Sequence, residues 1–278
     1  MDNSAATKPV IAFEEVRIGF AEGEVLRGLT FDVTQSETKV LAGESGTGKT
    51  LTLKLAAGLL HPDSGKILVL GRNLAEMTEI ELLEFRRQIG FVFQEGALFD
   101  SMTVADNVAY RLREDELDEE EIEERVREAL RFVEMENALE QVPSELSGGM
   151  RRRVSIARAL VSRPKIVLYD SPTAGLDPVT SQTIITLILR LRDTQGVTSL
   201  LCTHRLQDAF GLANFHFDPH SDRVLPVGNN GAMPGNAAPP TNILVLRQGT
   251  VYFQGDQKAM LASQDEYLKR FLVPKDGK

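Results

Sequence analysis

Residues 43–50 have the residue types and the spacing of a loop that binds phosphate. The segment reads Gly43, Glu44, Ser45, Gly46, Thr47, Gly48, Lys49 and Thr50, with Leu51 directly after it. Such glycines let backbone N–H groups curve around phosphate oxygens at the start of a helix. Lys49 would then reach the β- and γ-phosphates of a nucleotide, and Thr50 would bind Mg²⁺. An ordinary glycine turn is the alternative. The apolar strand pattern before the segment and the helical pattern after it favour the phosphate site.

A carboxylate that could complete the magnesium shell occurs later in the chain. Asp170 directly follows the apolar run Ile166–Tyr169. A phosphate-binding loop needs such an acidic group, ideally at the end of a neighbouring strand. An aspartate that only ends a strand and starts a turn is the other interpretation, and Asp170 alone does not decide between the two.

Three further motifs follow in a fixed order and reveal a family resemblance. Gln94 follows the strand-like Phe91–Phe93, the segment Leu146–Met150 reads Leu-Ser-Gly-Gly-Met, and His204 follows Thr203. With the glycine-rich loop and Asp170, they resemble the Q-loop, signature motif and switch histidine of the ABC ATPases. The resemblance runs from about residue 11 to residue 271, with one proline- and glycine-rich interruption.

The resemblance implies a dimer that holds ATP between two copies. In that family two nucleotide-binding domains pack head to tail, and the signature motif of one chain faces the phosphates bound by the other. Ser147, Gly148 and Gly149 would supply this second contact, since the start of a helix attracts anions. Asp177, in a segment that matches the D-loop, would lie between the two sites.

The resemblance also implies roles for individual side chains. Phe20 falls where the family places an aromatic ring that stacks on adenine, and an ordinary core position is the alternative for it. Gln94 would contact Mg²⁺ and the attacking water, while its loop faces a membrane partner. His204 would donate a hydrogen bond to the γ-phosphate.

One residue departs from the family pattern. The family usually places a glutamate after the strand-ending aspartate, whereas this chain has Ser171. A hydroxyl group is not a carboxylate base, and loss of a positioned base commonly lowers a rate by about 10²- to 10⁴-fold. We therefore expect tight ATP binding with slow hydrolysis, supported by Lys49, Gln94, Asp170 and His204.

The subfamily signal lies in residues 94–102 and 107–113, which resemble the ATPases of Mce-type lipid transporters, the group that includes the Mla phospholipid system. This resemblance implies an integral membrane permease and a lipid-binding partner. A generic core role for Leu98, Phe99 and Val108 is the alternative, and importers of amino acids or other solutes share much of the pattern.

Composition limits the other possibilities. The chain has 278 residues and a formal net charge of −9, which disfavours a nucleic-acid partner. Its one cysteine, Cys202, is expected in the core, and Arg151–Arg153 are expected on a solvated helix face. The beginning lacks a secretion signal and no apolar run is long enough to span a bilayer, so we expect a cytoplasmic protein, peripheral on the inner face of the membrane.

The predicted fold is α/β, a P-loop NTPase core of the ABC ATPase kind, as one nucleotide-binding domain over residues 1–278. Alternating residues in Ile11–Val33 predict an N-terminal antiparallel β subdomain, and an inserted α-helical subdomain is expected over about 95–160. A helix is predicted at Thr50–Leu60. Residues 217–241, rich in Asp, Pro, Gly and Asn, are predicted to form an irregular surface insertion, and Pro219 disfavours a metal site at its histidines.

Two functions remain open. A transport ATPase coupled to a permease is favoured by the complete set of remaining motifs. An ATP-gated regulatory clamp with little hydrolysis is favoured by Ser171. An ABC ATPase of translation or chromosome maintenance is disfavoured, because those proteins resemble tandem cassettes or cassettes split by long coiled coils.

Overall fold

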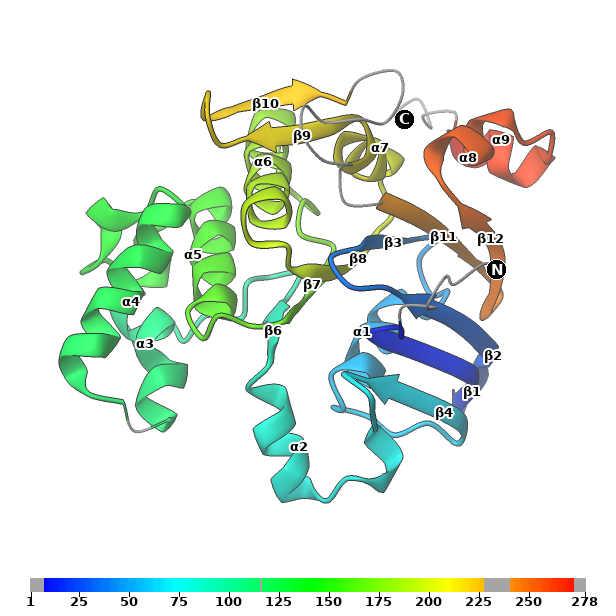
Figure 1. The fold of residues 1–278 in the computed structure, drawn as a ribbon, viewed down its shortest axis with the longest axis horizontal. Helices are drawn as coiled ribbons and strands as arrows, with labels where there is room; N and C mark the ends of the chain where they lie inside the picture. The colour runs from blue at the N-terminus through cyan, green and yellow to red at the C-terminus, as the bar shows by residue number, and fades with distance from the viewer. Residues whose placement is uncertain (1–7, 116, 228–240, 273–278) are drawn as a thin grey trace, which may run out of the picture.

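The computed structural model describes residues 8–115, 117–227 and 241–272, which form two larger β-sheets and one two-stranded sheet with helices around them (Figure 1). Within these residues the larger sheet has six strands, in the order β12-β11-β3-β8-β7-β6. Neighbours are parallel except β12, which is antiparallel to β11. Their bounds are β3 Thr38–Ala42, β6 Ile89–Val92, β7 Ile166–Asp170, β8 Thr198–Thr203, β11 Thr241–Arg247 and β12 Thr250–Gly255.

The N-terminal strands form the second, antiparallel sheet, as the alternating pattern predicted. Its order is β2-β1-β4-β5, with bounds β1 Ile11–Phe20, β2 Gly23–Val33, β4 Ser64–Val69 and β5 Arg72–Asn73. Leu53 and Leu55 of helix α1, Lys49–Ala56, pack in one apolar core with residues of both sheets. The predicted end of this helix at Leu60 is wrong. The backbone turns at Gly58, where a φ of 63° ends the helical path.

The middle of the chain is helical and gathers beside β6 (Figure 1). Its elements are α2 Glu79–Arg86, α3 Val104–Glu114, α4 Glu119–Phe132 and α5 Gly148–Leu160, with short 3₁₀ turns at Leu74–Glu76, Glu136–Ala138 and Pro143–Glu145. Four apolar residues at helical spacing, Ile122, Val126, Leu130 and Val133, are all buried. The acidic run before them occupies the first turn of α4, where carboxylates suit the positive end of the helix dipole.

The prediction of a solvated face at Arg151–Arg153 is wrong for its central residue. Arg152 is only 5% exposed, and its Nη1 donates to the carbonyl oxygen of Phe93 at 2.7 Å. The three side chains point in different directions around α5, because successive residues of a helix lie about 100° apart.

Residues 215–226 form a hairpin, so the prediction of an irregular insertion from residue 217 is wrong for this part. Strand β9, Phe215–Asp218, pairs antiparallel with β10, Arg223–Pro226. Asp218 closes the turn by accepting from the His220 amide at 3.1 Å and the Ser221 hydroxyl at 2.7 Å. The turn-forming residues that suggested a loop are thus the connection of a hairpin. Residues 228–240 of the predicted insertion lie outside the described residues.

The remaining helices are α6 Pro178–Gln195, α7 Leu206–Asn214, α8 Gln257–Ala262 and α9 Glu266–Leu272. Among the described residues, no helix combines the length and apolar character that a membrane span requires. No cluster of His, Cys, Asp and Glu within the same ranges could hold a metal ion, which includes the described histidines of the hairpin.

A buried ion pair fastens the hairpin to the body of the protein. Arg192 on α6 is 2% exposed and pairs with Asp193 at 2.6 Å. Its guanidinium also donates to the carbonyl oxygens of Leu212 at 2.6 Å and Phe215 at 3.0 Å. Asp193 accepts from the Phe217 amide at 2.7 Å, so both partners hold strand β9.

We expect Arg192→Ala to lower the free energy of unfolding by about 3–5 kcal/mol, because it leaves the Asp193 carboxylate buried without its partner. Urea unfolding followed by circular dichroism measures the change. Arg131→Ala is the control, since the Arg131–Glu136 pair is exposed and its loss should leave the urea midpoint unchanged. Equal midpoints for both variants would contradict the role of Arg192.

Candidate functional site

Four parallel strands end at the same edge of the larger sheet. In the register, Ala42 lies beside Thr203, Cys202 beside Asp170, and Tyr169 beside Val92. The segments that follow these strand ends carry most of the residues predicted to do chemistry. A cavity of about 730 Å³ opens there. It is lined by Phe20, Val25, Ser45, Gly46, Gly48, Lys49, Thr50, Leu51, Lys54, Leu60, Gln94, Ser171 and His204.

The glycine-rich loop connects β3 to α1 and has a backbone that few other residues could adopt. Gly48 precedes the helix with a φ of 95°, and a Cβ there would collide with Leu26 of β2. At Gly43 a Cβ would lie 2.6 Å from the carbonyl oxygen of Leu246 on β11. These glycines allow the loop to pack tightly against two strands and to turn into the helix start.

Lys49 is the cation of the site. It is 9% exposed, and its ammonium group donates to the carbonyl oxygens of Gly43 at 2.9 Å and Glu44 at 2.7 Å. Burial lowers the pKa of Lys49, and the neighbouring acidic groups, Asp170 and Glu44 among them, act in the opposite direction. A buried ammonium group inside a curved loop at a helix start is suited to polyphosphate.

Thr50 and Asp170 meet across the sheet edge. The Thr50 hydroxyl donates to Oδ1 of Asp170 at 3.0 Å, and Asp170 is 6% exposed at the end of β7. A hydroxyl oxygen and a carboxylate oxygen at this separation are the hard ligands that Mg²⁺ prefers, so the donor set fits that ion. Cys202 lies beneath them as the expected core residue, with its thiol bonded to the Lys49 carbonyl at 3.2 Å. Burial raises the pKa of this thiol, which keeps it protonated.

Phe20 and Ser171 have unusual positions in the cavity. The Phe20 ring is 56% exposed, so the alternative of an ordinary core residue is wrong. Ser171 is 8% exposed and has a φ of 47°, which is uncommon for a residue with a side chain. Its amide donates to the Cys202 carbonyl at 2.9 Å, which fixes this backbone beside β8.

The residues around Ser147 lie outside this cavity. Ser147 caps α5 by accepting from the Met150 amide at 3.2 Å, and Gly149 packs tightly against Thr180 of α6. Asp177 caps α6 in the same way, accepting from the amides of Val179 and Thr180 at 3.0 Å each. The structure therefore places the predicted residues in or directly beside one cavity and at two capped helix starts beyond it.

Two buried charged residues near the site were missed from the sequence. Asp208 on α7 is 3% exposed and accepts from the hydroxyls of Thr203 at 2.8 Å and Thr173 at 2.6 Å. It thus joins the segment after Ser171 to the segment that carries His204. A carboxylate in the first turn of the helix after His204 was the available signal. Arg152 is the other, and nothing in its spacing distinguishes it from Arg151 and Arg153.

The strand–loop–helix unit, the buried lysine and the paired Thr50 and Asp170 define an α/β protein with a phosphate-binding loop. The sequence pattern of the family described as "ABC transporter" matches residues 26–174. The chain belongs to the ABC transporter family, and the family resemblance predicted from the motifs is confirmed.

Relatives and a solved structure agree with this assignment. The chain is 41% identical over 191 residues to "Probable ribonucleotide transport ATP-binding protein mkl" of Mycobacterium leprae, covering 68% of this chain and 55% of that protein. It is 34% identical over 220 residues to the intermembrane phospholipid transport system ATP-binding protein MlaF of Haemophilus influenzae, covering 78% and 83%. The chain thus spans little more than half of the mkl relative.

The fold is that of a known ATP-binding cassette. A dimeric structure of the cassette MJ0796 in a post-hydrolysis state, bound to ADP and phosphate, superposes with a TM-score of 0.72 at 27% identity. The match covers 88% of this chain and 98% of that one. The predicted α/β ABC ATPase fold is confirmed.

Proposed function

We propose that this chain is the ATP-binding and ATP-hydrolysing subunit of an ABC transporter, working as a dimer with a membrane permease. One observation carries the proposal: the phosphate-binding loop, the Thr50–Asp170 pair, Gln94 and His204 meet at one sheet edge. These groups can bind the triphosphate, the metal and the attacking water together.

Each residue then has a defined task. Backbone amides of residues 43–51 and the Lys49 ammonium bind the phosphates, and Phe20 stacks on the adenine. Thr50, Asp170 and Gln94 hold Mg²⁺, which supplies charge neutralisation at the β- and γ-phosphates when bound. Gln94 also orients the water, and His204 donates to the γ-phosphate oxygens.

A second copy completes the site. Ser147, Gly148 and Gly149 lie at a helix start outside the cavity, where they can bind phosphate held by another chain. The dimeric MJ0796 cassette supports this arrangement. In a head-to-tail dimer, Asp177 lies at the seam between the two sites. ATP then holds the copies together, and loss of its γ-phosphate releases them.

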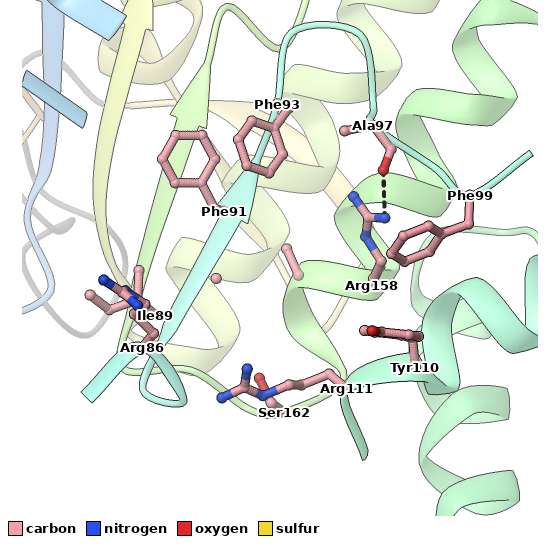
Figure 2. Close-up of a pocket in the computed structure, with 12 residues that line it drawn as sticks. Arg86, Ile89, Phe91, Phe93, Ala97, Phe99, Tyr110, Arg111, Arg158 and Ser162 are labelled. Atoms are coloured by element: carbon pink, nitrogen blue, oxygen red, sulfur yellow. Dashed lines mark hydrogen bonds between the residues drawn. The ribbon is translucent and has the colours of Figure 1, made fainter. Parts of the chain in front are cut away.

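A groove on this chain, beside the Gln94 loop, suits the binding of the permease. A cavity of about 300 Å³ lies between β6, α3 and α5, and Figure 2 shows aromatic rings and guanidinium groups around it. Phe99 and Tyr110 are 41% and 40% exposed, with ring centroids 4.8 Å apart. Such amphipathic rings favour a protein interface. Similarity to MlaF supports phospholipid as the substrate and a lipid-binding partner, at the inner face of the membrane. Another solute is the alternative.

A regulatory clamp is the second candidate function, and Ser171 favours it. The side chain at the position after Asp170 carries no carboxylate, so the cavity can bind ATP more readily than hydrolyse it. In that case the chains dimerise when ATP is bound and hydrolyse it slowly.

We expect Lys49→Ala to weaken Mg²⁺–ATP affinity by about 10- to 100-fold, because it removes a charge-assisted contact to phosphate. Equilibrium binding of a fluorescent ATP analogue measures affinity, and analytical ultracentrifugation measures ATP-dependent dimerisation. Lys66→Ala, which removes an exposed charge from β4 outside the cavity, should change affinity by less than about threefold. Unchanged affinity in Lys49→Ala, or no dimer with ATP and Mg²⁺, would refute the proposal.

We expect Ser171→Glu to raise the hydrolysis rate by about 10²-fold or more with little change in ATP affinity, because it supplies the missing base. Phosphate release, measured with and without the permease, gives the rate. The Ser171→Gln variant is the control: glutamine is nearly the same size as glutamate but has no carboxylate, so hydrolysis should stay slow. The interpretation that Ser171 lacks the catalytic base is wrong if glutamate does not raise the hydrolysis rate or if glutamine raises it equally.

We expect Phe99→Ala to reduce co-purification with a co-expressed permease by about fivefold or more, since aromatic anchors dominate such interfaces. Ile80→Ala, which truncates a side chain that is 75% exposed on α2, is the control. Mass spectrometry of lipids extracted from the complex tests the substrate. Retention by both variants, or a complex without enriched phospholipid, would contradict the respective assignment.

A further inference from the structure

The loop that carries Gln94 is fastened to helix α5 by two arginine side chains. Arg152 donates from Nη1 to the carbonyl oxygen of Phe93 at 2.7 Å. Arg158, less than two turns further along α5, donates to the carbonyl oxygens of Gly96 at 2.9 Å and Ala97 at 2.7 Å. Figure 2 shows Arg158 reaching Ala97 beside the groove. The two guanidinium groups therefore hold the loop on both sides of Gln94.

The Gln94 side chain itself is exposed, so its position depends on the backbone of its loop. Within the loop, the Gly96 amide donates to the Phe93 carbonyl at 3.0 Å. Arg152 shares that acceptor, which makes the Phe93 carbonyl the point where the loop and α5 meet. A shift of this carbonyl would move the next residue, Gln94, relative to Thr50 and Asp170.

Arg152 is well suited to fix a backbone position. It is 5% exposed, and burial lowers its pKa, while the charges of Asp170 and Glu95 act in the opposite direction. Its guanidinium is rigid and planar, and buried donors of this kind hold an acceptor in one place. It also places a positive charge near the strand end that carries Asp170.

Both arginines belong to the helix that begins at Ser147. Helix α5 runs from Gly148 to Leu160 and packs against β6, the strand that leads into the Gln94 loop. A helix is stiff over this length, so a movement of its start is carried to the carbonyls that its arginines hold. The start of the helix and the Gln94 loop are thus connected through one helix and the hydrogen bonds of its two arginines.

We propose that Arg152 and Arg158 are positioning residues that hold Gln94 in place for ATP hydrolysis and tie it to the helix start at Ser147. This inference rests on the proposed ATPase function, and it assigns a task to two side chains that do not line the nucleotide cavity. Neither arginine contacts the nucleotide; both act through Gln94.

Arg152→Gln in the full chain tests the proposal, with Arg153→Gln as the matched control. Arg153 is the next residue on the same helix, but it donates to the carbonyl oxygens of Val133 and Glu134, away from the Gln94 loop. Hydrogen exchange with mass spectrometry measures the mobility of residues 93–99. A single turnover of radiolabelled ATP, with protein in excess, measures slow hydrolysis.

For Arg152→Gln we expect about tenfold faster exchange over residues 93–99 and about tenfold slower hydrolysis, with ATP affinity changed by less than about threefold. Combining it with Gln94→Ala should slow hydrolysis no further than Gln94→Ala alone, because both changes remove the same positioned group. Arg153→Gln should change neither measurement. Arg152→Lys, which keeps the charge and one donor, should recover part of the rate and replaces Arg152→Gln if the latter does not fold.

Independent, multiplying effects of Arg152→Gln and Gln94→Ala would overturn the proposal, as would equal effects of the Arg152 and Arg153 variants. Failure of the proposed function is distinguished from failure of this inference by a different measurement. A wild-type chain that does not bind ATP refutes that function, whereas unchanged exchange over residues 93–99 in the Arg152 variants refutes the inference.

Discussion

The parallel, in-register pairing of β3, β8, β7 and β6 is the constraint on which the site depends. Parallel strands end at the same edge of a sheet, and the hydrogen-bonded register fixes how far each one extends. Residues far apart in sequence, such as Thr50 and Asp170, are thereby brought within hydrogen-bond distance. The buried core beneath this edge makes the arrangement rigid, because both faces of the sheet are covered.

Buried cations bonded to backbone carbonyls recur in this fold. Lys49 is held by carbonyls of its own loop, Arg152 by the Phe93 carbonyl, and Arg192 by carbonyls of the α7 end and β9. Taking a cation out of water is costly, and such bonds offset the cost only in a fixed geometry. Each cation therefore fixes the backbone carbonyls to which it is bonded. At Lys49 the bonds join residues of one loop, whereas at Arg152 and Arg192 they join different elements.

The division between the cavity and the helix start at Ser147 explains why the proposed function needs two copies. One chain offers the glycine-rich loop, Lys49 and the Thr50–Asp170 pair at one sheet edge, and the capped start of α5 lies elsewhere. If ATP bridges two copies, the Gln94 loop is the point where nucleotide, permease groove and α5 meet in one chain. Ser171 lies at the same edge. Under the proposed function, the same few residues therefore set the rate of hydrolysis and the lifetime of the dimer.

The sequence by itself determined the features that depend on neighbouring residues. The glycine-rich loop, the strand ending at Asp170, the Ser147 cap and the apolar face of α4 are local patterns, and the structure has all four. The order of the motifs along the chain identified the family, because each motif is itself a short run of residues that can be recognised in the sequence.

Only the tertiary structure decided which charged side chains are buried and where elements end. Arg152 and its neighbour Arg153 have the same chemistry, but the position of β6 buries one and leaves the other partly exposed. The hairpin at 215–226 depends on Arg192 and Asp193. The Thr50–Asp170 pair joins residues that are 120 positions apart, and it depends on the register of the strands. Such contacts are set by packing between distant segments, and local sequence carries no record of it.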